Sequence, residues 1–178
     1  MIKLLGLLLI FSLIQNNLFS QSKQEKVHLD FLSLMDSDDK TPIYYQIIQD
    51  RDWLEILSDS LKVSNLLRGG CRVKDIQEVF EAFDFEIFLD QEELNSNLEK
   101  WEKKKLPCLK VINKVPKDGN YVQYSVPIFS DEWATIRKQY FEDKKLLEDS
   151  IIVYQREKEK WNQVCLLLLS VNFPHYMN

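Results

Sequence analysis

The sequence has few of the residues on which metal and nucleophile chemistry depends. Its 178 residues include two histidines and three cysteines. None of Cys71, Cys108 and Cys165 belongs to a Cys-x-x-Cys pair, so zinc sites and thioredoxin-type redox sites have no support. We therefore expect no metal site, no cofactor and no catalytic residue that can be named from the sequence.

The chain also lacks an excess of positive charge. It carries 23 basic and 28 acidic residues, a formal net charge of −5. Its most basic run, Lys103–Lys105, is balanced by Glu99 and Glu102, which is typical of a solvated helix end. Because affinity for phosphates comes from clustered lysine and arginine, we expect no nucleic-acid partner.

Long hydrophobic runs are absent, but a short one lies at the start. Leu4–Ile14 is apolar, follows Lys3 and precedes the polar stretch Gln15–Asn17. The run is well short of the roughly 20 residues that a membrane-spanning helix needs. Ser20 then supplies a small residue before Gln21. This pattern predicts a signal peptide over residues 1–20, cleaved after Ser20, and a secreted or periplasmic protein without a membrane span after cleavage.

The remainder of the chain, residues 21–178, contains no internal repeat and no low-complexity segment, so we expect one domain. In an oxidising compartment one pair of the three cysteines can close and leave one thiol over. The sequence does not choose the pair. The interpretation favoured for Cys108 and Cys165 is that both are buried free thiols.

The N-terminal half has mainly helical patterns. The first helical face is Val27, Phe31, Leu34 and Met35, at helical spacing. Thr41–Pro42 then resembles a helix start, although Tyr44–Ile48 also fits a strand. Gly69–Gly70 is the clearest break. Two capping-box spacings follow, Asp75–Glu78 and Asp90–Glu93; the second opens a helix with Leu94, Leu98 and Trp101 on one face, stopped at Leu106–Pro107.

The C-terminal half changes to a period of two, which predicts strands. The alternating faces are Leu109, Val111 and Val115; Val122, Tyr124, Val126 and Ile128; and Ala134, Ile136 and Tyr140. A charged loop over 142–149 and a tight connection over 157–160 separate the last strands. The expected fold is α+β: a helical N-terminal half packed on a C-terminal antiparallel meander of four or five strands, with a cone-shaped α+β roll as a variant.

The last expected strand has an unusual pattern. Val164–Leu169 is apolar without alternation. On a sheet with one wet face, half of these side chains would be in water. We therefore expect a central strand covered on both faces, in which truncation of Leu166 and truncation of Leu167 have similar, large effects.

Several motifs resemble a family of uncharacterised exported bacterial proteins. They are Tyr124–Ser130 (YSVPIFS), an Ala134-x-Ile136 strand, Lys160–Trp161 at the start of the last strand, and Phe88–Leu94 before the sheet. The resemblance covers about 85–90 residues of the C-terminal half. It departs from the family at 142–149, where glycines are usual and this chain has charges. It implies export and the fold, and no function.

Three local patterns partly resemble functional sites. Asp36–Asp39 clusters carboxylates, but Thr41 and Ile47 occupy the positions where a calcium loop needs glycine and glutamate. Cys71 beside Arg72 would need His28 as a base to act as a nucleophile. Ser125 lacks the glycines of a nucleophile elbow. A solvated turn, an incidental cysteine and an edge strand interrupted by Pro127 explain these patterns better.

The sequence therefore predicts a non-catalytic secreted or periplasmic domain that binds a partner protein or an envelope component. Two alternatives stay open. One is a hydrolase that acts on an envelope substrate in a pocket between helices and sheet. The other is an immunity-type inhibitor that blocks a toxin with an acidic face.

Overall fold

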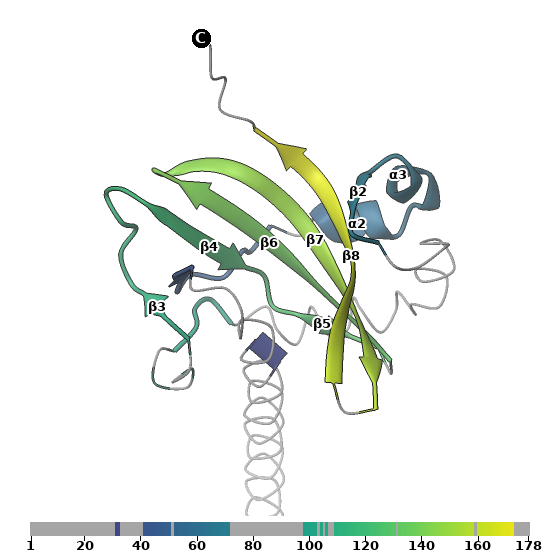
Figure 1. Cartoon of the computed structure of the whole chain (residues 1–178), viewed down its shortest axis with the longest axis horizontal. Coiled ribbons are helices and arrows are strands. Elements are labelled where there is room, and N and C mark those ends of the chain that lie inside the picture. Colours follow the sequence, from purple (N-terminus) through teal and green to yellow (C-terminus); the bar gives the residue numbers. More distant parts are fainter. Residues whose placement is uncertain are drawn as a thin grey trace, which may run out of the picture.

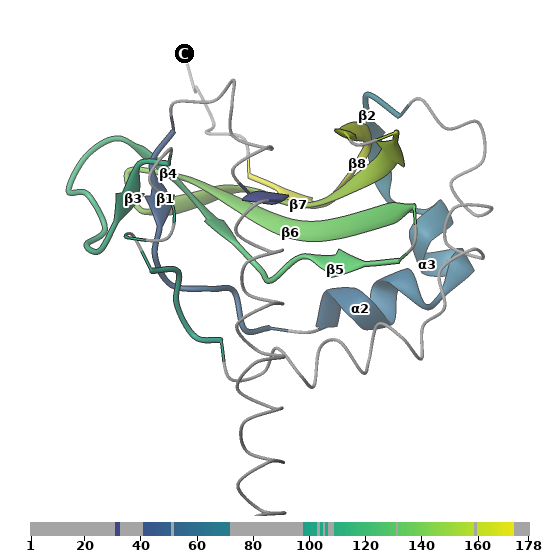
Figure 2. The ribbon, with the colours of Figure 1, turned by 90° about the horizontal axis from the view of Figure 1, so that it is seen from below.

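The protein is described by a computed structural model over residues 31–32, 41–50, 52–71, 98–102, 104, 106, 109–130, 132–158 and 160–172. This part of the chain forms one strongly curved, eight-stranded sheet with two short helices against one face (Figures 1 and 2). The expected signal peptide at residues 1–20 and most of the expected helix over 27–35 lie outside the described residues; Phe31 and Leu32 are helical and buried.

Four long or medium strands form an antiparallel series. They are β4 (Asn120–Tyr124), β6 (Trp133–Glu142), β7 (Lys145–Glu157) and β8 (Lys160–Val171), each paired with the next. The short strand β5 (Ile128–Phe129) pairs with the beginning of β6. Pro127 lies in the break between β4 and β5, where no ladder hydrogen bond needs its missing N–H.

Three short strands complete the sheet and give it mixed strand orientation. β1 (Ile43–Tyr44) runs parallel to both β3 (Val111–Ile112) and β4. β2 (Leu67–Gly69) pairs antiparallel with β8 at the other end. The order is β2-β8-β7-β6-β4-β1-β3, so the sheet is not a purely antiparallel meander.

Tight turns join the three longest strands. Between β6 and β7 the turn is Asp143–Lys144, and both residues have positive φ, 48° and 66°. Positive φ at both central residues is the geometry that fits the twist of a two-residue hairpin. The charged stretch 142–149 is therefore strand apart from this turn, and the loop expected there is wrong. The short connection expected at 157–160 is present.

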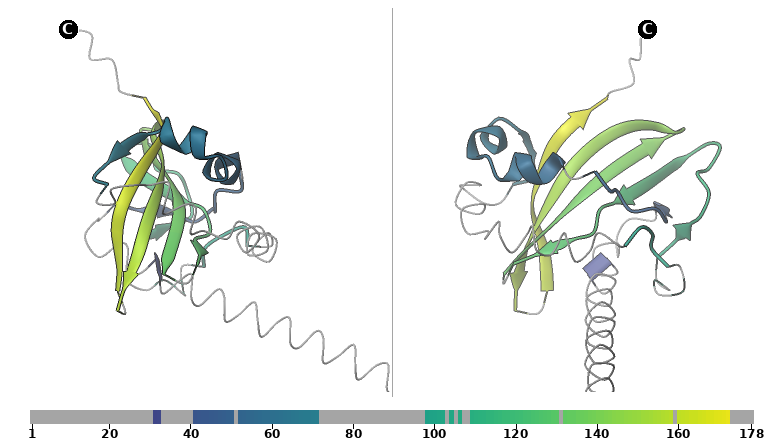
Figure 3. Two further views of the ribbon diagram at one scale, coloured as in Figure 1. Left: turned by 90° about the vertical axis from the view of Figure 1, so that its right-hand side faces the viewer. Right: turned by 180° about the vertical axis from the view of Figure 1, so that it is seen from behind.

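The helices α2 (Asp52–Leu57) and α3 (Ser60–Ser64) lie against one face of the sheet (Figure 3). Asp59 caps α3: its carboxylate accepts hydrogen bonds from the N–H groups of Leu61 and Lys62, at 3.0 and 3.3 Å. The buried face of α2 consists of Trp53, Leu54 and Leu57. These contacts position both helices over β7 and β8.

The predicted fold class, a helical N-terminal half packed on an antiparallel meander, is wrong. Ile43–Tyr44 is a strand where a helix was expected to begin, and the stretch Leu98–Trp101 is not helical. The reason is an ambiguity of spacing: Ile43 and Ile47, four residues apart, share one face of either a helix or a strand. Tyr45 packs against the same core, so the true period is two. Parallel pairing with β3 and β4 then decides the conformation.

The sheet has a hydrophobic core on each face. β7 contributes to both, because Ile151 and Val153 point toward the helices while Ile152 and Tyr154 point the other way. The helix-side core also contains Trp53, Leu54, Leu57, Val63, Ile128, Val164, Cys165 and Leu167. The opposite core also contains Phe31, Leu32, Ile43, Ile47, Trp101, Leu106, Leu109, Val111, Val122, Tyr124, Ala134 and Ile136.

A disulfide joins Cys71, just beyond β2, to Cys165 in β8. The interpretation of Cys165 as a free thiol is therefore wrong, and Cys108 lies outside the described residues. The bond lies beside the three-residue ladder between β2 and β8. Because the Cys165 side chain is fully buried, thiol attack on Cys71 would expel a thiolate into an apolar core, which identifies a structural bond.

The two faces of β8 are covered unequally at its centre among the described residues. Leu167 has 0% exposure, whereas Leu166 and Leu168 on the other face are half-buried. The expectation of equal burial on both faces is thus wrong. The cause is position: β2 is the last strand beyond β8, and α2 and α3 cover only the side to which Leu167 points.

The two faces of β8 predict unequal effects of truncation. Leu167→Ala removes a fully buried side chain and should cost about 2–5 kcal/mol of unfolding free energy. Leu168→Ala, on the open face, should cost clearly less. Urea denaturation of both variants checks this, and equal losses would mean that the open face is covered.

The disulfide predicts a large redox effect on stability. The bond spans 94 residues, and closing a loop of that size contributes about 4–5 kcal/mol in the chain-entropy account. The oxidised protein should therefore unfold at much higher urea concentration than the reduced protein. The double variant Cys71→Ala, Cys165→Ala should not respond to reductant. Identical unfolding midpoints for the oxidised and reduced wild type would show that the disulfide does not stabilise the fold.

Candidate binding site

An exposed apolar surface lies where β2 meets β8. Leu67 in β2 stands opposite Leu168 in β8, and Gly69 stands opposite Leu166. Leu67 has 70% exposure, and the other two leucines are half-buried. We call the surface formed by Leu67, Leu166 and Leu168 the β2–β8 patch.

The alternation of side chains along β2 sets the direction of the patch. Arg68 pairs with Leu167, whose side chain points into the helix-side core. Because successive residues of a strand point to opposite faces, Leu67 and Gly69 point away from α2 and α3. A Cβ atom on Gly69 would stand 3.2 Å from Cδ2 of Leu166, so the glycine leaves the space that Leu166 occupies.

The patch is at the margin of the opposite core. Leu166 packs against that core and pairs with Ile152 of β7, which is buried. Leu168 pairs with Ser150, and Leu67 lies one strand further out. Cover among the described residues thus decreases from β7 to β2, and Leu67 is left in contact with solvent.

A second exposed leucine, Leu61, lies in a different place. Its exposure is 73%, close to that of Leu67. It belongs to α3, which packs on the helix-side face through Val63. Leu61 therefore has the same side chain and the same exposure but does not share the open face of β8.

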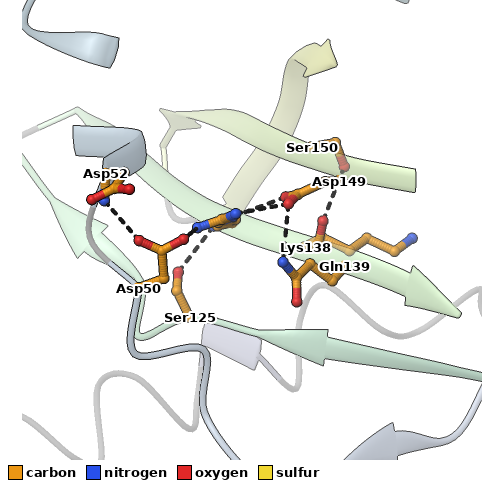
Figure 4. A network of polar contacts seen from close by, with 8 residues as sticks. Asp50, Asp52, Ser125, Lys138, Gln139, Asp149 and Ser150 are labelled. Atoms are coloured by element: carbon orange, nitrogen blue, oxygen red, sulfur yellow. Dashed lines mark hydrogen bonds and ion pairs between the residues drawn. The ribbon is translucent and has the colours of Figure 1, made fainter. Parts of the chain in front are cut away.

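The most polar cluster in the described chain surrounds Arg137 of β6 (Figure 4). The Asp149 carboxylate accepts two hydrogen bonds from the guanidinium, from Nε at 2.9 Å and from Nη2 at 2.7 Å. Asp50 accepts a third from Nη1 at 2.9 Å. The Gln139 amide also donates to Asp149, at 2.9 Å. Arg137 and Asp149 are buried, whereas the Asp50 side chain is about half exposed.

This network ties a loop to the sheet. The chain between β1 and α2 crosses the face of the sheet and brings Asp50 to Arg137 (Figures 3 and 4). The two hydrogen bonds to Asp149 and the one to Asp50 hold the pKa of Arg137 above its ordinary value, although burial lowers it. Asp50 also accepts from the N–H of Asp52, at the first residue of α2. The cluster is paired throughout, which is the arrangement of a structural ion pair.

The residues weighed as sites from the sequence do not converge. Cys71 is disulfide-bonded and has no thiol to act as a nucleophile. Ser125 accepts a hydrogen bond from the Arg137 backbone N–H at 3.0 Å and donates to Val126 O at 3.1 Å. His28 and Asp36–Asp39 lie outside the described residues.

Over the described ranges, no three His, Cys, Asp or Glu side chains gather as they would around a metal ion. No helix in the part of the chain that the structure describes has the length and apolar character needed to cross a membrane.

Comparison with known proteins gives no further guide. No protein-family model, no curated protein and no solved structure matches this chain.

The sequence signal for the patch was present but incomplete. The unbroken apolar run Val164–Leu169 identified β8 as unusual. The sequence did not predict β2, the strand that pairs with β8, because nothing around Leu67 indicates a strand beside Leu168. The Arg137 network was missed for the same reason: Asp50 lies 87 residues away in sequence.

The network predicts unequal roles for its two carboxylates. Asp149→Ala leaves a buried guanidinium without its main partner and should cost about 3–5 kcal/mol of stability. Asp50→Ala removes a half-exposed partner and should cost roughly 1 kcal/mol or less. Chemical denaturation of both variants measures this. Equal losses would show that the two ion pairs are energetically alike.

Proposed function

We propose that this chain is a non-catalytic secreted or periplasmic domain that binds a partner protein through the β2–β8 patch. One observation carries the proposal. Leu67 has 70% exposure and lies on the terminal described strand, at the margin of a hydrophobic core. It continues the half-buried leucines Leu166 and Leu168 into a single surface.

The patch presents contiguous apolar side chains to solvent. Single exposed leucines are ordinary, but contiguous apolar side chains on a soluble protein typically mark an interaction site. Burying one leucine side chain contributes about 1.5–3 kcal/mol. Because Leu166 and Leu168 are already half-buried, most of this gain comes from Leu67.

The position of the patch supports a protein partner. β2 is the terminal strand in the order of described strands, and terminal strands offer backbone donors and acceptors to another chain. Arg68 is exposed on the other face of β2. A partner that packs on Leu67 can therefore use apolar contacts, backbone pairing and a salt bridge together.

Two features support export. The apolar run Leu4–Ile14 with its polar flank fits a signal peptide that ends at Ser20. The Cys71–Cys165 bond fits an oxidising compartment, where disulfides persist. Neither feature depends on the patch.

The two alternatives have no specific observation in their favour. A hydrolase needs an acid, base or nucleophile that faces its substrate, and the most buried polar cluster of the described chain is centred on Arg137, a side chain that stays protonated and is no nucleophile. An immunity-type inhibitor needs an acidic face, and the charged residue nearest Leu67 along β2 is Arg68.

The test compares two equally exposed leucines. Leu67→Glu should abolish capture of the partner from envelope extracts of the producing cells, because it places a charge in the contact. Leu61→Glu changes the same side chain on α3 and should leave capture unchanged. Quantitative mass spectrometry of material bound to wild type and both variants measures the difference.

Stability and specificity controls complete this test. Both variants should keep the wild-type free energy of unfolding to within about 0.5 kcal/mol, since each changes an exposed surface position. Equal capture by wild type and Leu67→Glu, or no protein enriched by any form, would contradict the proposal.

A further inference from the structure

A row of aromatic rings crosses the helix-side face of the sheet at the end away from α2 and α3. It contains Tyr44 of β1, Tyr121 of β4 and Phe141 of β6. Tyr121 and Phe141 are cross-strand partners whose rings stack with centroids 4.7 Å apart and planes inclined by 2°. Tyr44 meets Tyr121 edge-on at 5.9 Å.

A row of amides runs beside the rings. Gln123 and Gln139 are the next cross-strand pair of β4 and β6 on the same face. The Gln139 amide nitrogen donates to Asp149, which leaves its carbonyl oxygen facing outward from that bond. Within the part of the chain that the structure describes, the Gln123 side chain makes no hydrogen bond, although it is half-buried. We call these five residues the aromatic–amide strip.

The aromatic residues of the strip differ in exposure. Tyr121 is buried between its two aromatic neighbours, whereas Tyr44 and Phe141 are only half-buried and reach solvent. α2 and α3 lie over the other end of this face (Figure 3). Rings and amides are therefore presented together on strands, which are rigid supports for recognition.

The strip is electrically neutral. None of its five residues is charged, and the charged residues beside Gln139, which are Arg137, Asp149 and Asp50, are hydrogen-bonded to one another. Burial raises the pKa of Tyr121, and the nearby Tyr44 hydroxyl raises it further, so the phenol stays protonated at physiological pH. A ligand that matches this surface carries no net charge but has apolar faces and polar edges.

We propose that the aromatic–amide strip binds a neutral glycan chain that contains acetamido sugars. The C–H faces of a pyranose ring fit the electron-rich faces of Tyr44 and Phe141. Acetamido and hydroxyl groups match the donor and acceptor of Gln123 and the carbonyl of Gln139. This inference does not depend on the β2–β8 patch, which is formed by other strands on the opposite face.

The experiment titrates isotope-labelled full chain with a β-1,4-linked N-acetylglucosamine tetramer and follows backbone amide resonances. Saturable shifts should be confined to β1, β4 and β6, centred on the strip. A tetramer of glucose, which lacks acetamido groups, should bind at least about tenfold more weakly, because an unpaired amide loses roughly 1–2 kcal/mol.

Two variants make the assignment specific. Gln123→Ala removes the free amide and should weaken binding by about tenfold, in line with the loss of one hydrogen bond. Gln163→Ala removes an exposed glutamine of β8, outside the strip, and should bind as wild type does. Unchanged thermal midpoints for both variants exclude a folding defect.

Three outcomes would overturn the inference. They are no saturable shift with either sugar at millimolar concentration, equal weakening in both variants, and shifts at the strip that depend on protein concentration without sugar. The last would identify a second copy of the chain as the occupant.

Discussion

The structure depends on one constraint, which is that the centre of β7 is apolar on both faces. Ile151, Ile152, Val153 and Tyr154 are all buried, and neighbours in this run point in opposite directions. A strand of this kind is stable only between two layers. The helices α2 and α3 supply one layer, and residues of β1, the region around Trp101 and the helical pair Phe31–Leu32 supply the other. The N-terminal part of the chain is thus organised by what the C-terminal strands must bury.

The same constraint explains where the surface is open. β8 is as apolar as β7, but among the described strands only the three-residue β2 lies beyond it. Cover on the helix side reaches Leu167, and cover on the other side becomes partial at Leu166 and Leu168. Hydrogen bonds of so short a strand give little stability alone. The Cys71–Cys165 bond holds β2 in place, and with it the exposed Leu67. The proposed binding surface therefore depends on a disulfide that holds the terminal described strand of an apolar sheet.

Local patterns predicted the long strands and the turn before Lys160, but they did not predict the tight turn between β6 and β7 or contacts distant in sequence. The alternation in β6 and the polar connection before Lys160 were sufficient for two strands and a turn. Ile43 and Ile47 were misinterpreted because a spacing of four fits a helix and a strand alike, and pairing with Val111 and Val122 decided it. Arg137 and Asp149 sit on adjacent strands, so their contact follows from hairpin register, which the sequence leaves open. Leu67 lies beside Leu168, and Cys71 beside Cys165, because of the register of β2 on β8, which the sequence also does not indicate.

Site-specific photo-crosslinking in the producing cells tests the central claim most directly. A photoreactive amino acid placed at position 67 stands within the β2–β8 patch, and one placed at position 61 stands equally exposed on α3. The account predicts one discrete crosslinked protein at position 67 and none at position 61. A crosslink of the same mass and yield at both positions, or at position 61 alone, would contradict it.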